Sequence, residues 1–132
     1  AATRHGPRPV EAKPTEWADA ASGMTALETA RSVVLETMVE PGLLDWAGVA
    51  QVLSTRPARI GRVEGHGRPI AVGEPANLVL VDPAARVRVT GAHQATSSRN
   101  TPFEGRTLPG RVMATFLRGR ATVLDAQPVT DR

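Results

Sequence analysis

The apolar residues between positions 25 and 40 recur at the spacing of one helix face. Thr25 and Glu28 stand three residues apart, the spacing of a capping box, in which a hydroxyl and a carboxylate satisfy free amides at a helix start. We therefore predict a helix from Thr25 that Pro41 and Gly42 end. Its predicted buried face consists of Leu27, Ala30, Val34 and Met38.

A second helix is predicted over about 45–53, followed by a short helical turn at 57–60 that ends at Gly61. The predicted buried side of the second helix consists of Trp46, Val49, Ala50 and Leu53. Residues 1–23, in contrast, contain one glycine and three prolines within positions 6–14, so we expect a loop there.

After about residue 63 the pattern changes to that of strands. The apolar run 77–82 ends at Pro83 and predicts a buried strand, and 86–90 alternates as a half-exposed strand does. Residues 111–125 predict two strands around a turn at Arg118 and Gly119. The chain thus divides into a helical part and a β part, neither of which can bury both of its faces. We expect this chain to be the tail of a larger protein, with further residues before Ala1.

Composition narrows the classes of function. With 132 residues the chain suffices for one compact domain, and its few aromatics, none of them tyrosine, predict an aliphatic core. The arginines are scattered and the net charge is only +3, which argues against a nucleic-acid partner. The absence of cysteine excludes disulfides, a thiolate nucleophile and cysteine-based zinc sites, and suits a cytoplasmic protein. No apolar run approaches a membrane span, and no signal peptide is present.

The stretch "ATRHGPRP" at 2–9 looks like a metal-site turn with unsuitable residues in it. Arg4 and Arg8 are cations where a site that handles a metal or an activated water needs an acid and a histidine. His5 is interpreted as a hydrogen-bonded structural histidine rather than a ligand. His66, between two glycines, and His93, in a polar loop, are interpreted as solvated.

Five stretches carry a resemblance to one family. They are "ATRHGPRP", "KPTEWADAASGMTALETA", "LSTRPARIG", "VGEPANLVLVDP" and "RNTPFEGRTLPGRV". In this order they resemble the C-terminal third of bacterial dihydroorotases, which are amidohydrolases. The segments 100–105 and 23–29 are rather specific to that family.

The resemblance implies an α/β fold, the C-terminal part of a metal-dependent (β/α)8-barrel hydrolase. Residues 1–63 would be the end of the barrel, namely its last-strand loop and C-terminal helices. Residues 64–132 would be the C-terminal strands of a small composite β-sandwich. A complete barrel needs roughly 200 residues or more, so most of it would lie upstream of this chain.

The resemblance also implies a chemistry, the interconversion of N-carbamoyl-L-aspartate and dihydroorotate in pyrimidine synthesis. In the family, zinc lowers the pKa of a bound water and polarises the carbonyl, but the zinc ligands come from strands that this chain lacks. The small-molecule substrate is therefore expected only with an upstream barrel. No nucleic-acid or membrane partner is expected.

Family members read Thr-Asp-His-Ala-Pro-His where this chain has residues 3–8. Arg4 stands in place of the catalytic, metal-contacting aspartate and is expected to be non-functional, because an arginine stays protonated and neither accepts a proton nor binds zinc. Arg8 stands in place of a substrate-binding histidine and can pair with a carboxylate. Ser22 and Gly23 stand where the family uses a Phe-Gly pair whose backbone contacts the substrate.

Three interpretations stay open. The chain is the C-terminal portion of a dihydroorotase-like enzyme, inactive on its own because the zinc ligands are absent and Arg4 replaces the aspartate. Alternatively, it belongs to a non-catalytic scaffold that partners aspartate transcarbamoylase, which Arg4 and Arg8 would fit. A third alternative is another cyclic-amide hydrolase of the allantoinase or dihydropyrimidinase type.

Overall fold

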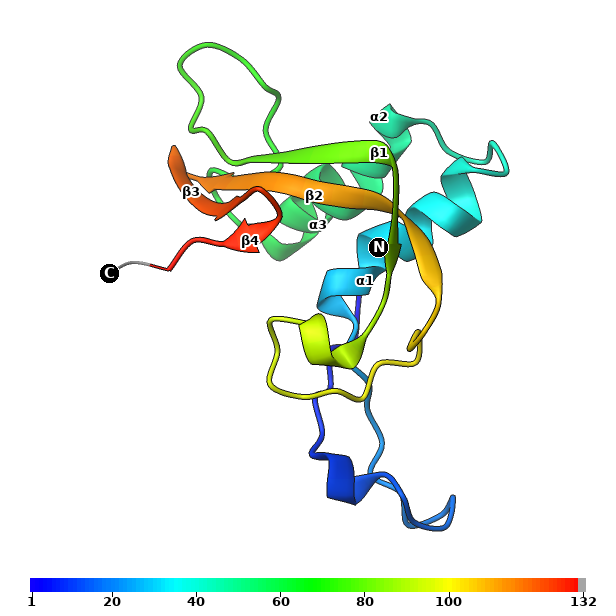
Figure 1. The fold of residues 1–132 in the computed structure, drawn as a ribbon. Helices are drawn as coiled ribbons and strands as arrows, with labels where there is room; N and C mark the ends of the chain where they lie inside the picture. Colours follow the sequence, from blue (N-terminus) through cyan, green and yellow to red (C-terminus); the bar gives the residue numbers. More distant parts are fainter. Residues whose placement is uncertain (131–132) are drawn as a thin grey trace.

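A computed structural model describes residues 1–130 of the chain (Figure 1). In this range the longer helical elements lie between Leu27 and Gly61 and the strands follow from Leu78, with two short 3-10 turns, η1 (Val10–Ala12) and η4 (Gly91–His93), outside them. The helices lie along one side of a long, twisted antiparallel sheet, as Figure 1 shows. The last two residues of the expected β part, 131–132, lie outside the described range.

Two continuous helical segments form the first part of the fold. Helix α1 (Leu27–Val34) runs directly into the π-helical turn η2 (Leu35–Val39). Helix α2 (Trp46–Ala50), the π-helical turn η3 (Gln51–Thr55) and helix α3 (Arg56–Gly61) together form the second segment. Asp45 caps α2 by accepting a hydrogen bond from the Gly48 amide at 2.7 Å. Both predicted helices are confirmed, the second being longer than expected, but Trp46 and Ala50 of its predicted buried side are exposed. No described helix is long and apolar enough to cross a membrane.

The predicted capping box at the start of α1 is wrong. The Thr25 hydroxyl bonds to Gln94 Oε1 at 3.0 Å, and the Glu28 carboxylate accepts from the Ala95 amide at 3.0 Å. His5 caps the helix instead, because its Nδ1 accepts from the amide of Ala26 at 3.1 Å. The loop after η4 therefore binds both side chains that the sequence pattern assigned to the helix cap.

The predicted buried face of α1 is wrong at Leu27, whereas Ala30, Val34 and Met38 are half-buried. Leu27 is 63% exposed, and the side that packs on the sheet consists of Thr29, Ser32 and Leu35, all buried. Ser32 Oγ donates to the Gly110 carbonyl in the sheet at 3.4 Å. Small polar residues on this side allow the helix to approach the sheet backbone closely, an arrangement that an apolar periodicity does not reveal.

Arg31 lies at the same contact between helix and sheet. Its Nη2 donates to the Gly110 carbonyl at 3.2 Å, while its buried Nη1 has no partner among the described residues. Burial lowers the pKa of the Arg31 guanidinium, because desolvation disfavours the charged form.

The sheet has the order β1-β2-β3-β4, with every neighbouring pair antiparallel. Its strands are β1 (Leu78–Arg88), β2 (Thr107–Leu117), β3 (Arg120–Leu124) and β4 (Gln127–Pro128). The predicted turn between β2 and β3 is confirmed, and both Arg118 (φ 51°) and Gly119 (φ 82°) take the left-handed conformation that a tight hairpin requires. The buried apolar residues are aliphatic: Ala26, Leu35, Val49, Val89, Leu108 and Ala114.

Strand β1 corrects two predictions. Pro83 does not end the strand, because the pairing register shifts between Asp82 and Arg86 and leaves the proline, which has no N–H, in an irregularity. Asp82 Oδ1 accepts from the Ala84 amide at 2.9 Å within it. The run 77–82 is not a buried strand either, since Val79 is 57% exposed and Leu80 62%. β1 is an edge strand whose apolar side chains the described residues leave largely uncovered.

Candidate functional site

Two loop segments that are distant in sequence meet at the start of α1. The amide of Gly6 donates to the carbonyl of Met24 at 2.8 Å, which joins residues 5–8 to residues 21–24. Gly23 has a φ of +129°, and a Cβ there would lie 2.7 Å from the Gly6 carbonyl oxygen. Only glycine fits this position, because both the backbone angle and the close approach exclude a side chain.

The loop at 98–100 ties the two segments together. Asn100 Nδ2 donates to the carbonyls of Gly6 at 3.2 Å and Gly23 at 3.1 Å. Its Oδ1 accepts from the Arg8 amide at 3.2 Å, and Ser98 Oγ accepts from the same amide at 2.9 Å. Figure 1 shows this yellow loop beside the blue N-terminal segment, away from β3 and β4. Asn100 is thus a central anchor of the site.

Arg8 and Lys13 fix the carbonyls of the second segment. Arg8 Nε donates to the Ser22 carbonyl at 2.8 Å. Lys13 Nζ donates to the carbonyls of Ala21 and Gly23, each at 2.7 Å. The two Nη groups of Arg8 make no hydrogen bond or ion pair within residues 1–130 and remain open to a ligand. The side chain of Arg8 therefore holds the loop through one nitrogen and presents two others.

Of the four residues singled out from the sequence, the structure joins three. Arg8, Ser22 and Gly23 lie together through the bonds above. Arg4 is exposed, and its side chain makes no hydrogen bond or ion pair with any described residue. His5, one residue on, turns inward and caps α1, so the interpretation of His5 as a hydrogen-bonded histidine is confirmed.

Replacing His5 tests its capping role. We expect His5→Ala to lower the free energy of unfolding by about 1 kcal/mol, because the first amides of α1 lose their acceptor. The measurement is the urea unfolding midpoint followed by circular dichroism. His5→Asn is the matched control, since asparagine is a good capping residue and should retain most of the stability. Equal stability of the alanine variant and the parent chain would contradict the role.

The residues of this site do not form a zinc centre. Within residues 1–130 no group of three or more His, Asp or Glu side chains gathers in a way that could hold a metal ion. Arg4 brings a positive charge, and the Nδ1 of His5 is already occupied by the helix amides. We therefore derive no chemical step through a metal from the residues of this chain.

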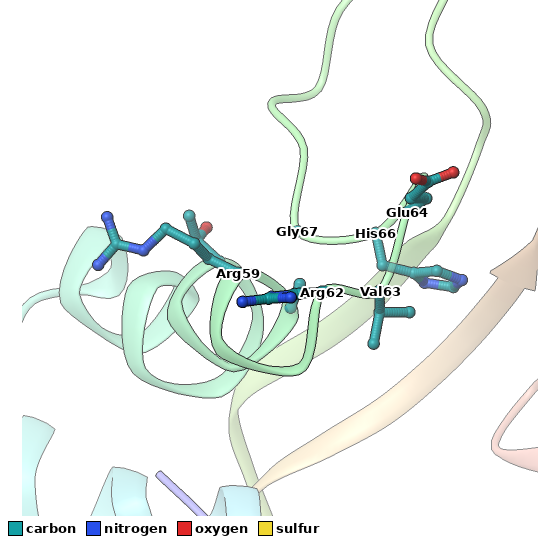
Figure 2. A pocket seen from close by; sticks show the side chains of 8 residues that line it. Arg59, Arg62, Val63, Glu64, His66 and Gly67 are labelled. Carbon is teal, nitrogen blue, oxygen red and sulfur yellow. The ribbon is translucent and has the colours of Figure 1, made fainter.

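A depression lies between α3 and the loop that follows it, lined by Arg59, Arg62, Glu64 and His66 among others (Figure 2). Figure 2 shows the side chains of Arg59 and His66 pointing in opposite directions. Because its charged groups do not converge, this depression is not a built binding site.

Sequence comparison gives one consistent family. No protein-family model matches the chain. Dihydroorotase from Streptomyces coelicolor is 62% identical over 126 residues, which is 96% of this chain and 29% of that protein. Dihydroorotase from Mycobacterium tuberculosis is 52% identical over the same shares of the two chains. Nearly the whole chain is similar to these dihydroorotases. It spans only about 29% of the length of these dihydroorotases.

Solved structures of related amidohydrolases confirm the fold class. D-hydantoinase (dihydropyrimidinase) from Thermus sp. superposes with a TM-score of 0.83 at 29% identity, over 96% of this chain and 28% of that one. L-hydantoinase (dihydropyrimidinase) from Arthrobacter aurescens gives a TM-score of 0.84 at 27% identity, over 96% and 29%. Helices followed by an antiparallel sheet are consistent with the C-terminal part of this fold.

Sequence reasoning did not assign a role in the site to Lys13 or Asn100. Asn100 was singled out only as part of the segment 100–105, although its two-ended amide suits it to join loops. Lys13 carries a usable signal, since it is the only lysine among the 16 lysines and arginines of the sequence. A single lysine in a chain whose other basic residues are arginines is a candidate for a specific hydrogen-bonding role.

Proposed function

We propose that this chain supplies the substrate-holding loop of a dihydroorotase-like cyclic amide hydrolase. The observation that carries the proposal is the placement of Arg8 beside Ser22 and Gly23, with its two Nη groups open. A guanidinium binds a carboxylate through two parallel hydrogen bonds, and dihydroorotate and N-carbamoyl-L-aspartate both carry a carboxylate. The similarity of the chain to dihydroorotases supports this substrate class.

We propose further that the chain lacks the acid–base group of the reaction. Arg4 stands where the family resemblance places an aspartate, and its guanidinium stays protonated at every physiological pH. A positioned acid or base contributes on the order of 10²–10⁴ in rate. A protein with this sequence at the site would therefore bind substrate but turn it over slowly.

A chimera tests the substrate class. The segment of Streptomyces coelicolor dihydroorotase that matches this chain would be replaced by the chain, so that the relative supplies the remainder of the protein. We expect this chimera to bind dihydroorotate in preference to dihydrouracil, hydantoin and allantoin, measured by calorimetric titration. Preference for a ligand without a carboxylate would overturn the assignment and favour the hydantoinase alternative, which the solved neighbours support.

Arg4 and Arg8 also motivate a second candidate, a non-catalytic partner of aspartate transcarbamoylase. Two cations replace an acid and a histidine in the family pattern, which suits a site no longer used for chemistry. This candidate predicts that the chimera folds, fails to bind dihydroorotate, and co-migrates with aspartate transcarbamoylase in gel filtration. Binding of dihydroorotate without co-migration would contradict it.

A further inference from the structure

The segment 21–24 has an asymmetric pattern of hydrogen bonds. Every carbonyl in it is occupied: that of Met24 accepts from Gly6, and the three before it accept from the side chains of Lys13, Arg8 and Asn100. The amides of Ser22, Gly23 and Met24 donate to no group among residues 1–130. The backbone of the segment therefore offers free hydrogen-bond donors, while each of its carbonyls already has a partner.

Fixing a carbonyl also fixes the amide that follows it, because the peptide unit is planar and trans. The bond from Lys13 to the Ala21 carbonyl thus sets the direction of the Ser22 N–H. Its second bond, to the Gly23 carbonyl, sets the direction of the Met24 N–H. Arg8 does the same for the Gly23 N–H through the Ser22 carbonyl.

We propose that Lys13 is a positioning residue that aims the free amides of Ser22 and Met24 at a ligand with oxygen acceptors, such as a carboxylate or a ring carbonyl. This inference rests on the proposed function for the identity of the ligand. Lys13 does not touch the ligand in this scheme and acts through the backbone. A lone ammonium carries three hydrogens on one nitrogen and reaches two converging carbonyls at 2.7 Å.

Arginine is not expected to replace Lys13. Its donors are spread over a planar fork of three nitrogens, which does not reproduce one nitrogen shared by two carbonyls. The Gly23 carbonyl would keep its bond from Asn100 in either variant, whereas the Ala21 carbonyl would lose its only partner among residues 1–130. The largest change is therefore expected in the peptide unit between Ala21 and Ser22.

The test compares Lys13→Met, Lys13→Arg and the unaltered protein by nuclear magnetic resonance, with Arg59→Met as the control, all in the chimera with Streptomyces coelicolor dihydroorotase. Arg59 is an exposed cation in α3 that lies outside this loop. We expect the carbonyl carbon resonance of Ala21 and the amide resonance of Ser22 to move in both Lys13 variants and not in the control. Unchanged resonances in Lys13→Met would overturn the proposal.

A titration with dihydroorotate provides the functional readout. We expect it to shift the amides of Ser22 and Met24 in the unaltered chimera, and the affinity to fall about tenfold in Lys13→Met, the cost of misdirecting one or two hydrogen bonds. Lys13→Arg keeps the charge and should not restore the affinity. Full rescue by arginine would mean that Lys13 acts through charge alone, and would overturn the positioning role.

The two readouts separate this inference from the proposed function. Resonances of Ala21 and Ser22 that depend on Lys13, in an unaltered chimera whose amides do not respond to dihydroorotate, would support the loop geometry and contradict the proposed substrate. Altered resonances with an affinity equal to that of the unaltered chimera would contradict the positioning role and leave the substrate class intact.

Discussion

Replacing Arg4 by aspartate in the chimera is expected to raise the rate of dihydroorotate hydrolysis by about 10²–10⁴. Aspartate restores a carboxylate that accepts and returns a proton at neutral pH, whereas the arginine it replaces stays charged. The Arg4 side chain makes no hydrogen bond or ion pair with any described residue, so its removal costs little stability. The measurement is kcat for dihydroorotate in the two chimeras.

Arg4→Asn is the matched control for that substitution. Asparagine has the size of aspartate and removes the positive charge, but it does not accept a proton at neutral pH. A gain in kcat with aspartate and not with asparagine would assign the effect to proton transfer. Equal gains with both variants would show that relief of the positive charge suffices, and would contradict the acid–base explanation.

Gly110→Ala is expected to lower the free energy of unfolding of the chain by about 2–5 kcal/mol. Gly110 has a φ of +79°, which costs a residue with a Cβ about 1–2 kcal/mol. Its Cβ would also lie 2.5 Å from Leu35 Cδ1, and overpacking of this kind costs about 1–3 kcal/mol. The contact falls on the end of the Leu35 side chain, which would have to change its conformation in a site that leaves only 3% of it exposed.

Gly73→Ala separates the two contributions to that loss. Gly73 has a similar φ of +89°, but a Cβ there would meet nothing within 4 Å. We expect only the backbone cost at this position, measured as a shift in the urea midpoint.

Leu35→Ala combined with Gly110→Ala should cost less than the sum of the single changes, because the shorter side chain removes the clash. Strict additivity would contradict the packing explanation.

The sequence predicts helices and turns better than it predicts which residues these elements contact. The helices and the turn at Arg118 follow from periodicity and turn chemistry, which are local. The cap of α1 could not be predicted, because His5 is 21 residues away from Ala26, the amide it accepts from. The buried side of α1 depends on the left-handed Gly110 in β2, which no pattern within the helix reveals.

The candidate site shows the same difference between local features and contacts of distant residues. Arg8, Ser22 and Gly23 were found through the family resemblance, and the structure places them together. Lys13 and Asn100 act on backbone carbonyls, so their contribution depends on the fold of a loop rather than on a motif. Residues whose side chains bind backbone carbonyls show no characteristic spacing in a sequence.

If this sequence keeps a substrate-holding loop and lacks the acid–base group, binding and turnover should separate. Both Kd and kcat for dihydroorotate would be measured for the unaltered chimera and for its Streptomyces coelicolor parent. We expect a Kd within about tenfold of that of the parent, a difference of 1.4 kcal/mol, and a kcat at least about 100-fold lower. A chimera that turns over dihydroorotate at the rate of the parent would contradict this expectation.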